Sequence, residues 1–237
     1  MRVLRRSLVA FGGDEDAASA VEFSIVLPIL LVLLLGGSQV VVYINATRKV
    51  QQVATSVSEM LSQAAPAIST NSTATINSTD LEFSYDAALV IFPYVMTDSQ
   101  RQGIAWRTDL LVSMASVSFT PNNNICIGAD LSGCYTSNVD WTSTGTPSGA
   151  YRPCGHSQNP IDNGAPYNRT GLPRSLYGPG SVVVVDVRFT FTPTFGAGFV
   201  GPITITRSAF VQPRYVTTIG FDATNPTGIA TTCPSTS

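Results

Sequence analysis

An uncharged apolar run near the N-terminus constrains this chain more than any other feature. Residues 23–44, FSIVLPILLVLLLGGSQVVVYI, contain no Asp, Glu, Lys or Arg. At 1.5 Å per residue a helix of this length spans about 33 Å, close to the roughly 30 Å hydrocarbon core of a bilayer. The run exceeds the roughly 7–15 apolar residues of a secretory signal. We therefore predict a retained transmembrane span, with ordinary signal cleavage as the less favoured alternative.

The helical pattern continues beyond this span. Apolar residues recur at steps of 3, 4, 3 and 1 among Gln, Thr and Ser, which is typical of one face of an amphipathic helix. Pro66 and a Ser/Thr/Asn-rich stretch follow. We predict one long helix over 18–65, apolar in its first half and amphipathic in its second, whose stripe packs on the domain that follows: Val50, Val53, Val57, Met60 and Leu61.

The remainder of the chain predicts a small α+β domain over 66–237. An amphipathic helix laid on three or four antiparallel strands would bury both apolar faces. The segment 193–202 is Gly- and Pro-rich and is expected to be a hairpin loop. The other expected elements are a short helix within 79–95 that ends by Pro93, and strands at 107–119, 181–191 and 203–212.

A long stretch, 121–180, is rich in Gly, Pro, Ser and Asn and is expected to be an irregular loop. Long loops often carry function, and aromatic and basic residues could form a contact surface there: Tyr135, Trp141, Tyr151, Arg152, Tyr167 and Arg169. Packing of these aromatic residues against the sheet is the favoured interpretation. Three of the four cysteines lie in this loop and the fourth in the C-terminal tail. Four cysteines allow three pairings; we favour the pair that closes a short loop and the pair that pins the tail, Cys126–Cys134 and Cys154–Cys233.

All four cysteines lie beyond the apolar run, which favours an N-terminus inside the cell and a C-terminal domain on the oxidising side. Basic residues flank the run on both sides, so their bias is weak. The formal net charge is −2, only 12% of residues are charged, and there is one histidine, His156. These features argue against nucleic-acid binding, a metal site or a cofactor. Since no catalytic motif occurs either, we do not expect an enzyme.

The N-terminal segment AASAVEFSIVLPILLVLLLGG resembles the TadE-like family, the minor pilins or pseudopilins of the Tad/Flp type IV pilus. The most specific part is Val21-Glu22-Phe23 followed by Leu27-Pro28. The resemblance is strong over 17–63, moderate over 181–215, and weak between them. It implies a pilin-like fold, with the long helix packed on a small antiparallel sheet.

The resemblance also implies a processing and assembly role for residues at the start of the helix. In type IV pilins a prepilin peptidase cuts before the apolar helix, and a Glu at the fifth mature position is needed. Cleavage between Ala17 and Ala18 would make Glu22 fifth and Phe23 sixth, although the family usually has Gly where Ala17 stands. A buried carboxylate could then pair with the N-terminal amine of a neighbouring subunit and set register. The alternative is a helix-start carboxylate with Ser19 as N-cap.

By resemblance, the protein is expected to act in assembly of the Flp pilus, and so in surface adhesion and biofilm formation. Residues 1–17 would be a cytoplasmic basic leader, the span would lie in the bacterial inner membrane, and the domain would be periplasmic. Its partners would be other pilins, platform proteins and prepilin peptidase. The alternative is a single-span adhesin or envelope-binding protein that uses the 121–180 region and has no role in fibre assembly.

Overall fold

The computed structural model describes residues 15–68, 72–122, 124, 128–143, 152–166, 168–224 and 228–234. The chain divides into two compact units, each described here by itself. One unit joins Met1–Asn45 to Pro193–Pro202, and the other comprises Ala46–Thr192 and Ile203–Ser237. The division within the N-terminal helix therefore falls one residue after the predicted span ends.

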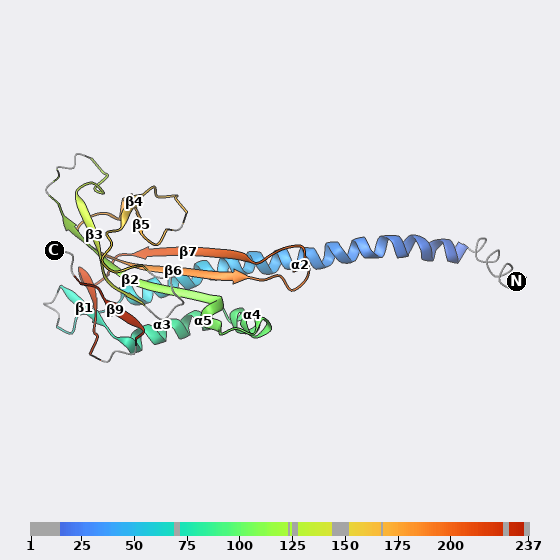
Figure 1. The fold of residues 1–237 in the computed structure, drawn as a ribbon, viewed down its shortest axis with the longest axis horizontal. Helices are drawn as coiled ribbons and strands as arrows, with labels where there is room; N and C mark the ends of the chain where they lie inside the picture. Colours follow the sequence, from blue (N-terminus) through green and yellow to red (C-terminus); the bar gives the residue numbers. More distant parts are fainter. Residues whose placement is uncertain are drawn as a thin grey trace, which may run out of the picture. The chain divides into compact units, whose positions relative to one another are not determined.

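The long helix, α2, runs from Glu15 to Ser62 and continues through Pro28 (Figure 1). Its start lies before the predicted residue 18, so Ser19 is inside the helix and is not its N-cap. Its end lies before the predicted residue 65. The last turn tightens there, with the amides of Gln63 and Ala64 donating to carbonyls three residues back, and the amide of Arg214 donates to the Ser62 carbonyl at 3.0 Å.

The second unit is built on a five-stranded antiparallel sheet, whereas three or four strands were expected. Two pairs of short parallel strands lie outside it. The sheet order is β7 (Ile203–Val211), β6 (Gly180–Phe191), β2 (Leu110–Pro121), β3 (Tyr135–Ser143) and β9 (Ala230–Thr232); the parallel pairs are β1 (Thr73–Ile76) with β8 (Thr218–Phe221), and β4 (Asn159–Ile161) with β5 (Gly171–Pro173).

Helices cover one face of this sheet. The C-terminal half of α2 buries the predicted stripe, with Val50, Val53 and Val57 fully buried and Met60 half-buried. The predicted helix within 79–95 is α3 (Ser78–Ile91), which begins with an Asn77–Asp80 capping box and ends before Pro93, as expected. Two further helices, α4 (Tyr94–Gln102) and α5 (Trp106–Asp109), were not predicted, and the strand expected from 107 begins at Leu110.

The opposite face of the sheet is covered as well, which the period-2 pattern of 181–191 does not predict. Val182 and Val184 alternate along the strand with Val183 and Val185, yet both are buried against a segment that includes Leu172, Tyr177 and a 3₁₀ helix, η1 (Arg174–Leu176). A central strand covered on both faces loses its polar side. The region 121–180 is consequently not one irregular loop, because it supplies β3, β4, β5 and this covering layer.

Candidate functional site

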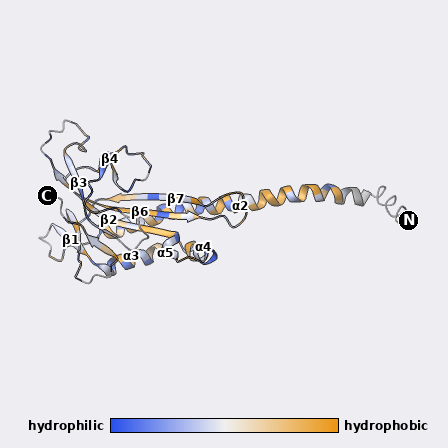
Figure 2. Ribbon diagram, in the orientation of Figure 1, coloured by the Kyte–Doolittle hydropathy of each residue, from blue (hydrophilic) through white to orange (hydrophobic). Residues whose placement is uncertain are grey.

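The N-terminal half of α2 exposes a continuous apolar surface. Val32, Leu33 and Leu34 are 71%, 67% and 68% exposed, and Figure 2 shows this half of the helix as predominantly hydrophobic. Within the described part of the chain, one helix is long and apolar enough, by length and composition, to cross a membrane. The mean hydropathy of its most apolar 18-residue window is 2.6, and no residue of that window is buried.

Polar groups inside this apolar surface are satisfied locally. The hydroxyls of Ser24 and Ser38 donate to the carbonyls three residues earlier, at 2.8 and 2.7 Å. The side-chain oxygen of Gln39 accepts from the amide of Thr194, at 2.9 Å, in the loop that belongs to the same compact unit. Because a hydrocarbon environment offers no water to these groups, their internal pairing suits a membrane-embedded helix.

The four residues predicted to act in processing and assembly all lie on α2. Ala17 and Ala18 belong to its first turn, and Glu22 and Phe23 follow on the exposed part of the helix. Glu22 is seven residues past the helix start, so the alternative of a helix-start carboxylate stabilised by the helix dipole does not apply to the full chain. It forms no ion pair within the described ranges. A cut between Ala17 and Ala18 would bring a new amine within about one turn of this carboxylate.

The disulfide predicted to pin the tail is confirmed. Cys154 bonds Cys233 across 79 residues of sequence, with their Cα atoms 5.1 Å apart. The amide of Cys233 also donates to the Asp140 carbonyl at 2.8 Å, next to the β3–β9 ladder. Cys126 lies outside the described residues, so its pairing with Cys134 stays a prediction.

The structure places two of the proposed contact-surface residues, Trp141 and Arg152, in the interior, whereas Arg169 is exposed. Trp141 is fully buried, and its indole N–H donates to the Ile219 carbonyl at 2.9 Å. Arg152 is 1% exposed, and its guanidinium pairs with Asp186 through two hydrogen bonds, at 2.9 and 3.3 Å. Trp141 is therefore an interior residue, as the favoured interpretation expected, although it lies on strand β3 of the sheet itself.

An acidic cluster that no sequence motif indicates lies where α4 meets α5. Asp98 accepts hydrogen bonds from Arg101 and Gln102, and Gln102 also lies 3.4 Å from Asp109. Burial raises the pKa of Asp109 to about 7, and the charge of Asp98 adds to this rise. Both carboxyls are 1% exposed, so the cluster is a structural pair and does not line an accessible site.

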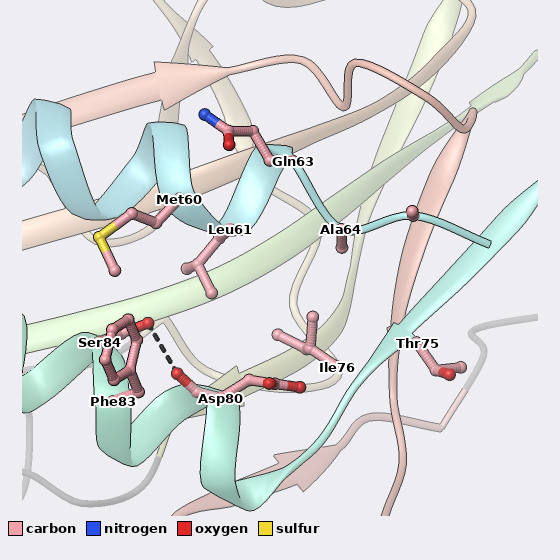
Figure 3. A pocket seen from close by; sticks show the side chains of 10 residues that line it. Met60, Leu61, Gln63, Ala64, Thr75, Ile76, Asp80, Phe83 and Ser84 are labelled. Carbon is pink, nitrogen blue, oxygen red and sulfur yellow. Dashed lines mark hydrogen bonds between the residues drawn. The ribbon is translucent and has the colours of Figure 1, made fainter. Parts of the chain in front are cut away.

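A cavity of about 400 Å³ opens between the end of α2, β1 and the start of α3 (Figure 3). Met60, Leu61 and Ile76 contribute apolar walls. Asp80 is the titratable group of the lining, and its carboxylate already accepts from the Asn77 amide at 2.9 Å. The cavity therefore presents no pair of groups suited to acid–base chemistry. Among the described residues, no cluster of three His, Cys, Asp or Glu side chains could hold a metal ion.

These features define a class of protein: an α+β domain built on a long N-terminal helix whose free half has the length and hydropathy of a membrane span. Residues 17–58 match the family model of TadE-like proteins. That match contains the Glu22 signature and most of the amphipathic helix, and it confirms the resemblance on which the functional expectation rests. Comparison of the chain with curated proteins and with solved structures finds no significant match in either set.

Proposed function

We propose that this protein is a minor pilin of the Tad/Flp type IV pilus, held in the inner membrane by residues 23–44 with its domain in the periplasm. The observation that carries the proposal is the TadE-like match over 17–58, a pilus-component family, on a helix whose first half is apolar and exposed. The protein acts through helix contacts with other pilins and with platform proteins, and so supports adhesion and biofilm formation.

The proposed mechanism gives Glu22 a specific task. A carboxylate on an apolar helix is costly in a membrane unless it meets a partner. Prepilin peptidase cleavage before Ala18 would create a cationic amine on each subunit, and pairing of that amine with Glu22 of a neighbour would fix the stagger between helices. This ion pair sets register more than it adds stability.

The alternative of an adhesin on a plain tether loses two of its candidate residues, because Trp141 and Arg152 are buried. In that alternative Glu22 would be dispensable. The minor-pilin proposal therefore requires the Glu22 carboxylate, whereas the adhesin alternative does not.

Replacing the Glu22 carboxylate tests the minor-pilin proposal. Glu22→Ala should strongly reduce surface pili while the protein accumulates in the membrane at its normal level. Glu59→Ala is the matched control, because Glu59 is an exposed glutamate farther along the same helix, outside the apolar run. Pilus counts by electron microscopy and the N-terminal sequence of each variant separate an assembly defect from a processing defect. Normal piliation of Glu22→Ala would refute the mechanism.

A further inference from the structure

The loop between β6 and β7 presents an apolar tip. Residues 193–202 read PTFGAGFVGP and carry no charge. Phe199 is 98% exposed, and Phe195 and Val200 are about half exposed, at 51% and 49%. So much aromatic and aliphatic surface at one loop tip is unusual in water and typical of an interaction surface.

The loop lies beside the predicted span, within one compact unit (Figure 1). Its position along the helix is given by the hydrogen bond from the Thr194 amide to the side chain of Gln39. Gln39 is five residues before the end of the apolar run at Ile44, which corresponds to about 7.5 Å along the helix axis. Amphipathic elements that lie in a membrane interface bury their apolar face about 5–10 Å deep, so this depth fits the boundary between headgroups and acyl chains.

The backbone of the tip is also suited to that boundary. Gly196 has a φ of 78°, and its carbonyl accepts from the amides of Phe199 and Val200, at 2.8 and 2.9 Å. Pro193 and Pro202 have no amide hydrogen to satisfy. At the base of the loop, the Arg101 guanidinium donates to the Thr192 carbonyl. The tip therefore satisfies several backbone groups internally while it turns its apolar side chains outward.

From this geometry we propose that the β6–β7 loop inserts Phe199, together with Phe195 and Val200, into the membrane interface on the side of the C-terminal domain. The occupant of the apolar tip is thus the lipid bilayer. The inference rests on the proposed membrane anchoring of α2, and it gives the chain a second lipid contact in addition to its helix.

Depth-dependent fluorescence quenching tests the proposal on the full chain. The chain is reconstituted at high lipid-to-protein ratio into phosphatidylcholine vesicles brominated either near the carbonyl end or near the methyl terminus of the acyl chains. Phe199→Trp reports the loop, Leu33→Trp reports the middle of the span, and Val90→Trp on α3, where the side chain is 82% exposed, reports a solvated position. The unsubstituted chain, with Trp106 and Trp141, provides the baseline.

Phe199→Trp should add a blue-shifted emission that is quenched most by bromines near the carbonyl end. Leu33→Trp should be quenched most by bromines near the methyl terminus, and Val90→Trp by neither. Quenching at Leu33→Trp with solvent-like emission at Phe199→Trp overturns the loop proposal and leaves the anchor intact. A blue shift at Phe199→Trp without lipid quenching also overturns it, in favour of a protein contact. Absence of quenching at both positions overturns the anchor and the loop contact together.

Discussion

Arg152 shows at the scale of one residue how the covering segment is joined to the sheet. Its guanidinium pairs with Asp186 at the centre of the sheet and also donates to the Gln158 side chain and the Gly171 carbonyl, at 2.5 and 2.9 Å. The Ser208 hydroxyl donates to the same aspartate at 2.6 Å. A buried ion pair with this many partners holds one arrangement of the segment against the sheet.

Removing only the Arg152 guanidinium should therefore destabilise the domain strongly. Arg152→Met leaves the Asp186 carboxylate buried without a counter-charge, and we expect a loss of about 3–5 kcal/mol in the free energy of unfolding. Combining it with Asp186→Leu should restore most of that loss, because no charge then stays buried. Denaturant unfolding of the full chain in detergent measures both.

The control for this pair is Arg174→Ala, which removes a half-exposed arginine that lies 3.5 Å from Asp130 and 3.6 Å from Asp162. Exposed pairs contribute little, so its unfolding midpoint should stay close to that of the parent chain. Equal effects of Arg152→Met and Arg174→Ala would contradict the role assigned to the buried pair.

Asp109 makes stability depend on pH. Its pKa is about 7 in the folded chain, against about 3.9 for an unfolded aspartate, so the folded state retains a proton that the unfolded state releases. The favourable contribution of Asp109 to the free energy of unfolding is complete below about pH 4. It is lost as pH rises to about 7, and the free energy of unfolding falls by at most about 1.4 kcal/mol per pH unit.

Asp109→Asn should remove this dependence, since an amide stays neutral throughout. The difference in melting temperature between Asp109→Asn and the parent chain should increase in favour of the variant from pH 5 to 7 and then level off. Asp86→Asn, an exposed position on α3, should give a constant difference over the same range. Parallel melting curves for Asp109→Asn and the parent at every pH would show that the aspartate titrates normally.

At the scale of elements, α2 has two environments within one continuous helix. Residues 46–62 bury an apolar stripe on the sheet, whereas residues 19–44 expose almost all of theirs. The first half therefore gains little from packing within its own chain, and most of its apolar surface is available to lipid or to other helices. This division is the structural basis for the anchoring and assembly proposed above.

We expect the short strand β9 to depend on the adjacent Cys154–Cys233 disulfide for its stability. It spans only Ala230–Thr232, and three residues at a sheet edge provide few ladder hydrogen bonds. Cys154→Ser with Cys233→Ser should lower the free energy of unfolding by about 2–5 kcal/mol and make the C-terminal tail the first site of limited proteolysis. The oxidised parent is the control. Recovery of Cys154 and Cys233 as free thiols in non-reducing peptide maps of the native protein would contradict the bond.

At the scale of the whole molecule, the proposed function depends on where the mature chain begins. Processing before Ala18 would remove residues 1–17 and convert the start of α2 into a charged N-terminus next to Glu22. Intact mass and N-terminal sequencing of the protein from its native membrane should give Ala18 as the first residue.

Ala17→Gly is the informative variant for this site, since it restores the residue that the family usually has before the cut. It should be processed at least as completely as the parent chain. Recovery of both proteins with an intact N-terminus would argue for a permanently anchored assembly factor, in which Glu22 has no new amine to meet.

The span, the amphipathic continuation and α3 were predictable because each depends on local periodicity and composition. Val50, Val53 and Val57 follow one helix face in the sequence and are fully buried in the structure. The β6–β7 hairpin was predictable for the same reason, since two patterned runs flank a Gly- and Pro-rich loop. The Cys154–Cys233 pair was one of several pairings that the sequence allowed.

Local pattern could not predict what covers the far face of the sheet. Val184 and Asp186 alternate with apolar residues and therefore suggest a solvated side, but the segment that carries Arg152 and Leu172 covers them. The same limit applies to the Asp98–Asp109 pair and to the loop amide beside Gln39. Contacts between residues that are distant in the sequence depend on chain topology, and topology produces no periodic pattern of apolar residues in the sequence. The sequence alone therefore determined an apolar helix with a TadE-like start, and only the tertiary structure decided which polar residues are buried and which loop lies beside that helix.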